Sequence, residues 1–175
     1  MSGLQRTCLN IGTLLPCTSR AKRSNGDSEY HYVSEAEFCH MISDEQFLFW
    51  HYDGDDVKGN AKYYGLTRDE VESGLGQYDH VLFSIGRSVA ARFFKSRFPF
   101  SKTIDLYPES TEQLQRQVAS RSGEAPQELQ RRLSLFRKSE NEHLSSFDTF
   151  ILNVSGQVEN AIEAVANLIG VSDVE

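Results

Sequence analysis

The sequence predicts an α/β fold with a mostly parallel sheet and helices on both of its faces. Short apolar runs alternate along the chain with segments that carry helix-start signals or helical spacing of apolar residues. This alternation is typical of parallel strands joined by helices. The near-continuous apolar run at 81–85 is typical of a strand that is covered on both faces. In sheets of this kind, ligands bind beyond the carboxyl ends of the strands.

Strands are predicted wherever a short apolar run lies between polar or turn-forming residues. The polar segment 53–62, which contains Gly54 and Gly59, is predicted to be a surface loop. Pro108 ends one of the apolar runs because proline cannot donate a hydrogen bond to a neighbouring strand. The predicted strands lie at 11–15, 46–50, 81–85, 103–107 and 147–152.

Helices are predicted from capping signals and from apolar spacing. The segments 34–37 and 67–70 both carry the Ser/Thr-x-x-Glu pattern of a capping box. The first is predicted to open a helix that reaches residue 41 or 42, and the second a short helix that ends near Gly74 or Gly76. Further helices are predicted at 87–97, at 110–120, from Pro126 onward as the longest helix, and at 158–170.

Length and charge exclude some classes of function. At 175 residues the chain is long enough for one domain with its own core. The net charge of −7 argues against non-specific binding of nucleic acid, which needs a cationic surface. No apolar run approaches the roughly 18 residues that a membrane helix needs, so no membrane partner is expected.

The cysteines and histidines give no metal-binding pattern. Cys8, Cys17 and Cys39 are odd in number and lack paired metal spacing, which is typical of free thiols in a reducing compartment. The chain is therefore expected to be cytoplasmic. Cys17 is predicted to be a buried thiol rather than a nucleophile. The histidines are too scattered in sequence to predict a metal site.

Several short motifs occur in one order along the chain and together resemble guanylate kinases. Thr-Ser-Arg-Ala-Lys-Arg at 18–23, followed by Tyr-His-Tyr-Val-Ser at 30–34, resembles the family signature Thr-Ser/Thr-Arg-x-x-Arg … Tyr-x-Phe-Val-Ser. Tyr-Tyr-Gly at 63–65, Ser-Arg-Ser-Gly-Glu at 120–124 and Ile-Leu-Asn at 151–153 are similar to later family motifs. The resemblance implies a three-layer α/β/α P-loop-kinase-like domain over 1–175. Its acceptor-binding region would span about 16–80 and its lid about 110–140.

The resemblance assigns the phosphate of a small phosphorylated acceptor to Arg20, Arg23, Tyr30 and Tyr64. The residue types suit that ligand, because guanidinium groups pair with phosphate through two parallel hydrogen bonds and phenols add further donors. Outside this ordered context, the same residues are more typical of solvated arginines and half-buried tyrosines.

The resemblance also implies ATP and Mg²⁺ as cofactors. Arg121 and Arg132 would then act as catalytic residues, supplying positive charge from the lid to the phosphoryl group that moves. Asn153 would lie near the adenine. A nucleotide lid also explains the basic residues of this region better than a nucleic-acid patch does, because the chain as a whole is acidic.

The glycine-rich phosphate loop of P-loop kinases is missing from the sequence. No Gly-x-x-x-x-Gly-Lys-Ser/Thr pattern occurs, and too few residues precede Ile11 to hold the first strand and that loop. We expect the sequence to be truncated at its N-terminus. Either Met1 is an internal methionine of a longer reading frame, or the gene has lost its front part.

The carboxylates with which guanylate kinases read guanine are also replaced. The glutamate expected before Trp50 is Phe49, and the aspartates expected near the end of the central strand are Ser84 and Gly86. Losing hydrogen bonds built into a specific site can cost roughly 10⁴-fold in discrimination, which argues against guanine as the selected base. The pair Trp50 and His51 is similar instead to ribose 1,5-bisphosphate phosphokinase, which favours a sugar phosphate.

Two hypotheses follow for the function. The first is a guanylate-kinase-like phosphotransferase that moves the γ-phosphate of ATP to a phosphorylated small acceptor, either GMP-like or a sugar phosphate. This chain is expected to be inactive because it lacks the phosphate loop. The alternative is a non-catalytic guanylate-kinase-like interaction module whose partner is another protein. The loss of the loop and of the base-reading acids favours the alternative, whereas the retained arginines and tyrosines favour the first.

Overall fold

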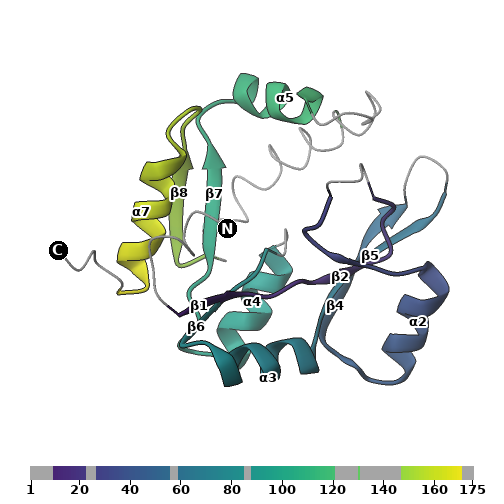
Figure 1. The fold of residues 1–175 in the computed structure, drawn as a ribbon. Coiled ribbons are helices and arrows are strands. Elements are labelled where there is room, and N and C mark those ends of the chain that lie inside the picture. Colours follow the sequence, from purple (N-terminus) through teal and green to yellow (C-terminus); the bar gives the residue numbers. More distant parts are fainter. Residues whose placement is uncertain are drawn as a thin grey trace. The chain divides into compact units, whose positions relative to one another are not determined.

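The computed structural model describes residues 10–22, 27–55, 59–84, 88–120, 130 and 147–170 (Figure 1). The chain divides into two units, of which the first comprises Leu9–Gly86 and the second Arg87–Glu175. Each unit has its own strands and helices.

Two short parallel strands form one part of the first unit. Strand β1 (Ile11–Thr13) pairs with β6 (His80–Leu82), and Ile11 lies opposite His80. The amide of Leu14 continues the ladder by donating to the carbonyl of Leu82 at 2.8 Å. The predicted strands at 11–15 and 81–85 are therefore confirmed as parallel neighbours, although both regular strands are shorter.

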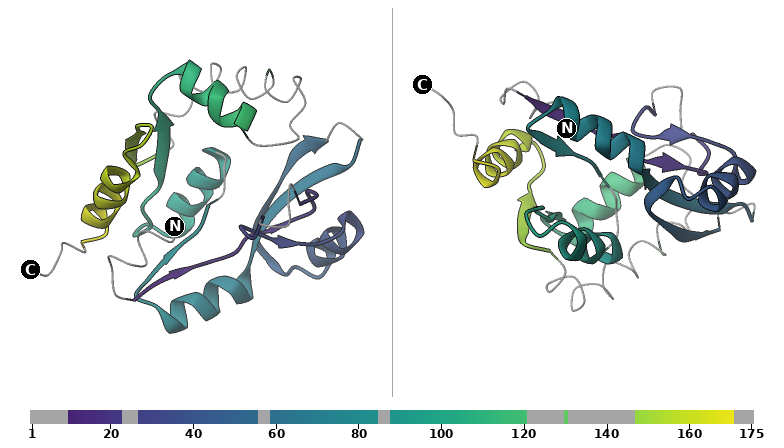
Figure 2. Two further views of the ribbon diagram at one scale, coloured as in Figure 1. Left: turned by 45° about the horizontal axis from the view of Figure 1, so that its top comes forward. Right: turned by 90° about the horizontal axis from the view of Figure 1, so that it is seen from below.

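A four-stranded sheet forms the other part of the first unit, in the order β3-β2-β5-β4. Strands β2 (Cys17–Thr18) and β3 (His31–Tyr32) are parallel, while β5 (Ala61–Thr67) runs antiparallel to β2 and to β4 (Phe47–Asp55). The antiparallel pairs were not predicted. Figure 2 shows β4 and β5 as a long ribbon of two strands.

The predicted surface loop at 53–62 is wrong in its extent. Strand β4 continues to Asp55, β5 begins at Ala61, and these two residues lie opposite each other. A register shift between Tyr52 and Asp55 lets the pairing continue through this polar stretch. Backbone pairing between neighbouring strands thus outweighs the turn-like composition.

Helix α2 (Glu35–Ser43) begins at the predicted capping box. The side chain of Ser34 accepts a hydrogen bond from the Glu37 amide at 3.1 Å, and the Glu37 carboxylate accepts one from the Ser34 amide at 3.4 Å. The helix buries Phe38 completely, and its ring stacks on Phe47 of β4 with 4.4 Å between ring centroids. Cys17 completes this core cluster.

Helix α3 (Arg68–Gln77) also begins as predicted, with the side chain of Thr67 accepting from the Glu70 amide at 3.3 Å. It runs past both predicted end points, Gly74 and Gly76. The glycine at position 74 is explained by packing and not by a helix end, since a Cβ atom there would lie 2.4 Å from a methyl group of Leu14. This glycine lets the helix approach the strand β1 region closely.

The second unit places helices around a parallel pair of strands. Strands β7 (Ile104–Pro108) and β8 (Thr149–Asn153) are parallel as predicted, and α7 (Val158–Leu168) packs against β8. Helices α4 (Ser88–Arg97) and α5 (Thr111–Ser120) confirm the predictions at 87–97 and 110–120. The predicted helix from Pro126 lies outside the described residues.

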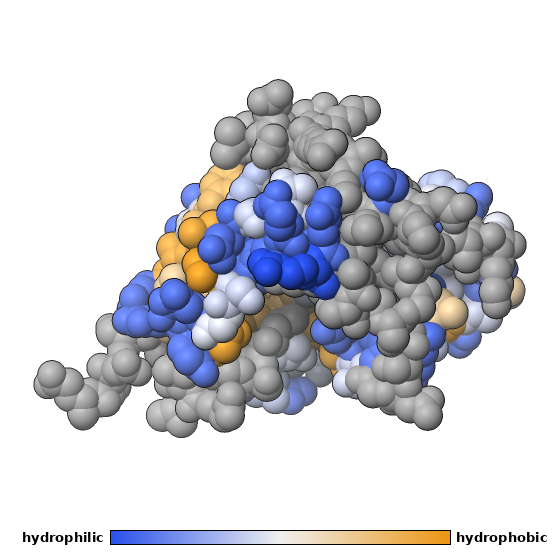
Figure 3. Space-filling view, turned by 90° about the horizontal axis from the view of Figure 1, so that it is seen from above, coloured by the Kyte–Doolittle hydropathy of each residue, from blue (hydrophilic) through white to orange (hydrophobic). Residues whose placement is uncertain are grey.

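Apolar side chains of the second unit both fill its interior and reach its surface. Phe94 and Ile151 are buried, as are alanines of α4 and α7. Hydrophobic residues also show at the left of Figure 3, on the side of α7. The exposed ones in β7, β8 and α7 are Leu106, Phe150, Leu152 and Val158.

Reciprocal hydrogen bonds join the chain just before β7 to the chain just before β8. Asp148 accepts from both the amide and the hydroxyl of Thr103, at 2.9 and 2.7 Å. The amide of Asp148 in turn donates to the carbonyl of Thr103 at 2.9 Å. Lys95 of α4 pairs with the same carboxylate at 2.8 Å. These contacts fix the register of the parallel pair.

Among the helices that the structure describes, none is long and apolar enough to cross a membrane.

Candidate functional site

The candidate site begins where β2 ends. Thr18 is fully buried, and its hydroxyl donates to the carbonyl of Tyr63 on β5 at 2.8 Å. The same oxygen accepts from the amide of Arg20 at 3.1 Å. Ser19 is fixed in the same way, since its hydroxyl donates to the Ala61 carbonyl at 2.8 Å and accepts from the Tyr63 amide at 2.9 Å. The backbone that carries Arg20 is therefore held firmly against β5.

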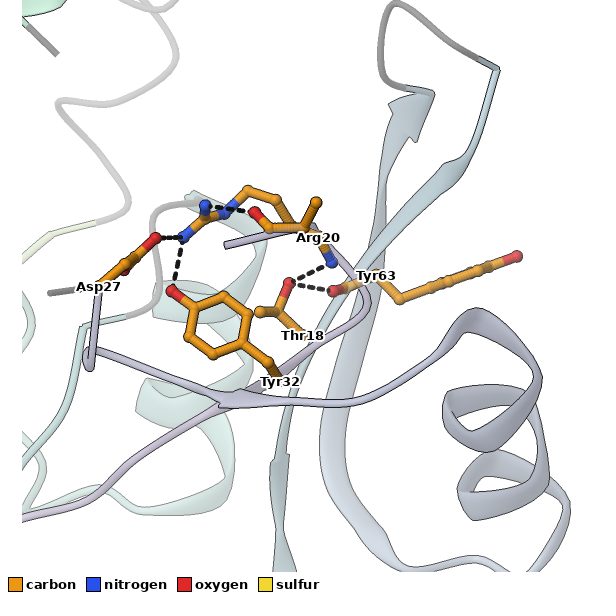
Figure 4. Close-up of polar contacts among 6 residues, drawn as sticks. Thr18, Arg20, Asp27, Tyr32 and Tyr63 are labelled. Carbon is orange, nitrogen blue, oxygen red and sulfur yellow. Dashed lines mark hydrogen bonds and ion pairs between the residues drawn. The ribbon is translucent and has the colours of Figure 1, made fainter. Parts of the chain in front are cut away.

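Arg20 points toward an acid and a phenol from the following segment, as Figure 4 shows. Its Nη2 lies 3.0 Å from Oδ2 of Asp27 and 3.0 Å from the hydroxyl oxygen of Tyr32. Its Nη1 donates to the carbonyl of Ala21 at 2.9 Å. The side chains of Arg20 and Asp27 are only 10% and 9% exposed. This ion pair is thus largely removed from solvent.

Aromatic rings surround the guanidinium group. The Arg20 Cζ atom lies 5.5 Å from the ring centroid of Tyr30 and 5.4 Å from that of Tyr32, within reach of cation–π attraction. The Tyr30 ring meets Tyr64 edge-on at 5.7 Å, and Tyr64 stacks on His51 at 5.6 Å. The structure therefore brings together Arg20, Tyr30 and Tyr64.

The charges in this cluster shift the pKa values of its members. Burial by itself lowers the pKa of Arg20, but Tyr64, Asp27 and Tyr32 outweigh burial and raise it above its ordinary value. Burial, followed by the hydrogen bond to Asp27, raises the pKa of Tyr32 to about 12. At neutral pH, Arg20 is a cation and Tyr32 a neutral phenol.

A cavity of about 200 Å³ lies beside this cluster. Its wall contains the backbone turn that carries Arg20, the start of β5 and the first residue of α2. Positive and negative groups both line it, so it suits a polar ligand of small size. The lining residues are Ser19, Arg20, Ala21, Glu35, Asn60, Ala61 and Lys62.

The part of β4 next to the cluster is aromatic rather than acidic. Phe49 is buried, and its ring centroid lies 5.7 Å from that of His51. Its neighbour across the ladder, Leu66, is completely buried. The position at which the sequence comparison expects a base-reading glutamate is therefore filled by an apolar ring.

The other predicted site residues lie outside the described residues or in the second unit. Arg23, Arg121 and Arg132 lie outside the described residues, as does Gly86. Asn153 lies at the end of β8 in the second unit, where its carbonyl accepts from the side chain of Gln113 at 2.7 Å. Among the described residues, no group of three or more His, Cys, Asp or Glu side chains could hold a metal ion.

Two residues of the cluster were missed by the sequence analysis. Asp27 lies in a segment that reads as a loop, and nothing in its composition points to Arg20. Tyr32 did carry a signal, because it stands where the family signature has phenylalanine. The added hydroxyl is the atom that reaches Arg20.

Comparison with known proteins places the chain in one family. A family model described as guanylate kinase matches residues 4–171. The chain is 35% identical to the guanylate kinase of Symbiobacterium thermophilum over 120 residues, which are 67% of this chain and 54% of that protein. It is 32% identical to the guanylate kinase of Bordetella pertussis over 141 residues, which are 79% of this chain and 62% of that protein. The chain thus spans between half and two thirds of these relatives.

The fold agrees with that similarity. The crystal structure of guanylate kinase from Anaplasma phagocytophilum matches with a TM-score of 0.70 at 20% identity, covering 99% of this chain and 80% of that chain. The predicted α/β class with parallel strands is confirmed by this match and by the parallel pairs of both units. The chain belongs to the guanylate kinase family.

Proposed function

We propose that this chain is a guanylate-kinase-like phosphotransferase whose first unit binds the phosphate of a small phosphorylated acceptor through Arg20. The single observation that carries the proposal is the convergence of Arg20, Tyr30 and Tyr64 from different parts of the sequence. The three residues come from separate motifs of the family signature. The Arg20 guanidinium lies 5.5 Å from the Tyr30 ring centroid, and the Tyr30 ring in turn meets that of Tyr64 at 5.7 Å.

The chemistry of the cluster suits a phosphate. A guanidinium group pairs with a phosphate more strongly than a neutral donor does, and low solvent exposure strengthens that attraction. Tyr30 and Tyr64 place hydroxyl-bearing rings around the same charge. The cavity beside Arg20 offers room for a small polar molecule rather than for a polymer.

The acceptor is either a nucleoside monophosphate such as GMP or a sugar phosphate. The names of the relatives favour GMP. The buried ring of Phe49 and the absence of an acid at that position favour a ligand whose recognition does not depend on guanine N–H groups. We therefore propose to test both kinds of acceptor.

ATP and Mg²⁺ are the family's phosphoryl donor and metal. Among the described residues, no three or more His, Cys, Asp or Glu side chains come together to hold a metal ion by themselves. Mg²⁺ in kinase sites is usually bound by one or two carboxylates, water and the phosphates of the substrate. Arg121 and Arg132, the proposed catalytic arginines, lie outside the described residues.

Titration calorimetry on the whole 175-residue chain tests the proposal. GMP and ribose 5-phosphate are compared with guanosine and ribose, which lack the phosphate. We expect a phosphorylated ligand to bind and its affinity to fall about 10-fold or more in Arg20→Ala, because charged hydrogen bonds to phosphate are lost. Arg68→Ala is the matched control, since the Arg68 side chain is exposed and its Nε donates to the backbone carbonyl of Glu45 at 3.2 Å.

A second variant controls for loss of folding in Arg20→Ala. Arg20→Ala leaves the buried carboxylate of Asp27 without its cation, which is strongly destabilising for buried pairs. Arg20→Lys keeps the charge but removes the planar fork, and it should also weaken phosphate binding. Equal affinity of the wild type, Arg20→Lys and Arg68→Ala for every phosphorylated ligand would refute the proposal and favour the non-catalytic interaction module.

A further inference from the structure

Arg20 is already paired with an anion of this chain. The carboxylate of Asp27 lies 3.0 Å from Nη2, and the Tyr32 hydroxyl lies at the same distance from that nitrogen. Tyr32 and Asp27 are also hydrogen-bonded to each other, as the raised pKa of Tyr32 reflects. The three side chains therefore form a closed cluster, named here the Arg20–Asp27–Tyr32 triad.

A bound phosphate and the carboxylate of Asp27 compete for the same charge. The described cations against Tyr32 are Arg20 and Lys22, whose Nζ lies 5.0 Å from the Tyr32 ring centroid. A phosphate monoester dianion neutralises these two positive charges by itself. Lys62 and Glu35 also line the cavity and contribute one charge of each sign. With Asp27 still in place, the site would therefore hold an excess of negative charge around Arg20 and Asp27, whose side chains are only 10% and 9% exposed, and like charges with so little solvent between them repel strongly.

The tether of Asp27 makes it a strong competitor. It lies seven residues from Arg20 in sequence, so it acts at a high effective concentration that a free anion must overcome. A monoanion brings no more charge than the carboxylate that it displaces. A phosphate monoester near neutral pH brings about 1.5 to 2 negative charges. It is therefore attracted to Arg20 more strongly than the Asp27 carboxylate is, whereas a monoanion only replaces one single negative charge by another.

We propose that the triad determines the charge class of the acceptor: a phosphate monoester displaces Asp27 from Arg20, whereas phosphodiesters and other monoanions do not. The inference rests on the proposed function, because it requires that the acceptor phosphate binds at Arg20. Asp27 and Tyr32 are then specificity-determining residues of the acceptor site.

The test is a titration of the whole chain with methyl phosphate and dimethyl phosphate, followed by NMR chemical shifts. Methyl phosphate carries the monoester dianion and dimethyl phosphate the diester monoanion. In Asp27→Asn we expect methyl phosphate to bind about 10-fold more tightly and dimethyl phosphate to gain measurable affinity, because the competing charge is gone. Tyr32→Phe, which loosens the hold on Asp27, should tighten methyl phosphate binding by a smaller factor, about 2- to 3-fold.

Asp55→Asn is the matched control. Asp55 likewise accepts a hydrogen bond from a tyrosine, Tyr52, at 2.6 Å, but on an exposed part of the hairpin. The Asp55→Asn substitution removes one negative charge from the chain, as Asp27→Asn does. Any change in affinity that the two variants share therefore comes from the net charge. We expect the affinities of Asp55→Asn to remain within about 2-fold of the wild type.

The outcomes separate the two proposals. If Arg20→Lys binds methyl phosphate as well as the wild type does, the proposed function fails. If Arg20→Lys binds more weakly while Asp27→Asn and Tyr32→Phe bind no more tightly than the wild type, only the present inference is overturned, and Asp27 is then a residue that positions Arg20. The dispersion of each variant's NMR spectrum reports whether it is folded.

Discussion

Cys17, the first residue of β2, lies in the core of the first unit in one cluster with Phe38 and Phe47. Burial, followed by the negative charges of Glu70 and Glu37, raises its pKa to about 11. A thiol with such a pKa stays protonated at neutral pH and is a poor nucleophile. Its position next to the cluster around Arg20 therefore reflects packing, as the sequence predicted.

We expect the cysteines to differ in reactivity for this reason. With iodoacetamide at pH 8, exposed Cys39 should be alkylated at least about 10-fold faster than Cys17, because Cys17 is buried and its raised pKa leaves little of it as thiolate. Peptide mass spectrometry at several time points measures each site separately. In guanidinium chloride the two rates should converge, and a Cys17 rate equal to that of Cys39 in the native chain would contradict the prediction.

The individual contacts of the cluster around Arg20 were only partly predictable from sequence. Arg20, Tyr30 and Tyr64 could be named because each belongs to a motif with a known role in related proteins. The pairing with Asp27 could not, because it depends on how the chain turns between β2 and β3. Sequence order alone does not tell which carboxylate a buried guanidinium meets.

At the scale of elements, the packing of α2 on the sheet depends on a glycine. Gly65 on β5 lies beneath the stacked rings, and a Cβ atom there would be 2.7 Å from the ring of Phe47 and 3.1 Å from that of Phe38. Real Cβ atoms do not approach ring carbons so closely. The contact between helix and sheet therefore leaves no room for a methyl group at this position.

Gly65→Ala should lower the free energy of unfolding by about 1–3 kcal/mol, since the rings of a well-packed core must move. Gly76→Ala is the matched control: it makes the same change within α3 at a position with no atom within 4 Å of the new methyl group. That variant should instead gain up to about 1 kcal/mol from helix propensity. Urea titrations followed by circular dichroism measure both, and equal effects of the two substitutions would be inconsistent with the packing argument.

Helix starts were more predictable than strand ends. The boxes at 34–37 and 67–70 act through bonds within four residues, so sequence spacing suffices to locate them. The extent of β4 depends on its partner β5 and on two register shifts, which local composition does not contain. The role of Gly74 was likewise not predictable from local sequence, because the side chain that it packs against, Leu14, lies far away in the sequence.

At the scale of the whole molecule, the stability of this acidic chain depends on pH through the carboxylate of Asp148, which resists protonation in the folded state. The ionised carboxylate of Asp148 contributes one negative charge to a chain whose net charge is −7. Although burial opposes this, the bonds from Lys95 and Thr103 lower its pKa from 3.8 to about 2. Because the folded state holds the proton less readily than the unfolded state, this contribution to stability is complete above pH 3.8 and is lost as the pH falls toward 2.

Asp148→Asn should therefore lower stability at neutral pH and flatten its dependence on pH in the acid range. We expect a loss of about 1 kcal/mol at pH 7, a discounted value because the pair is partly exposed to solvent, and a much smaller difference near pH 2. Urea unfolding at steps between pH 7 and 2 measures it. A difference between variant and wild type that stays constant over that range would show that hydrogen bonding alone, without the charge, accounts for the role of Asp148.

The fold class was the most predictable property of the molecule. Alternating strands and helices identify parallel pairing, and both β1–β6 and β7–β8 agree. The antiparallel ribbon is an addition that this alternation does not encode. It contains Phe49, His51 and Tyr64, so the part of the fold that was least predictable also forms a wall of the candidate site.

The order of the four-stranded sheet has a consequence for self-association. Strand β4 is nine residues long and is an edge strand of the four-stranded sheet that the described residues form. Edge strands are the places where a sheet can pair with a strand of another chain. Trp50 and Tyr52, 43% and 51% exposed, would add apolar contacts to such a dimer. The register shifts and the positive φ of Gly54 interrupt the strand's regular geometry. These irregularities deprive an incoming chain of a straight template, and straightening them by mutation would favour aggregation.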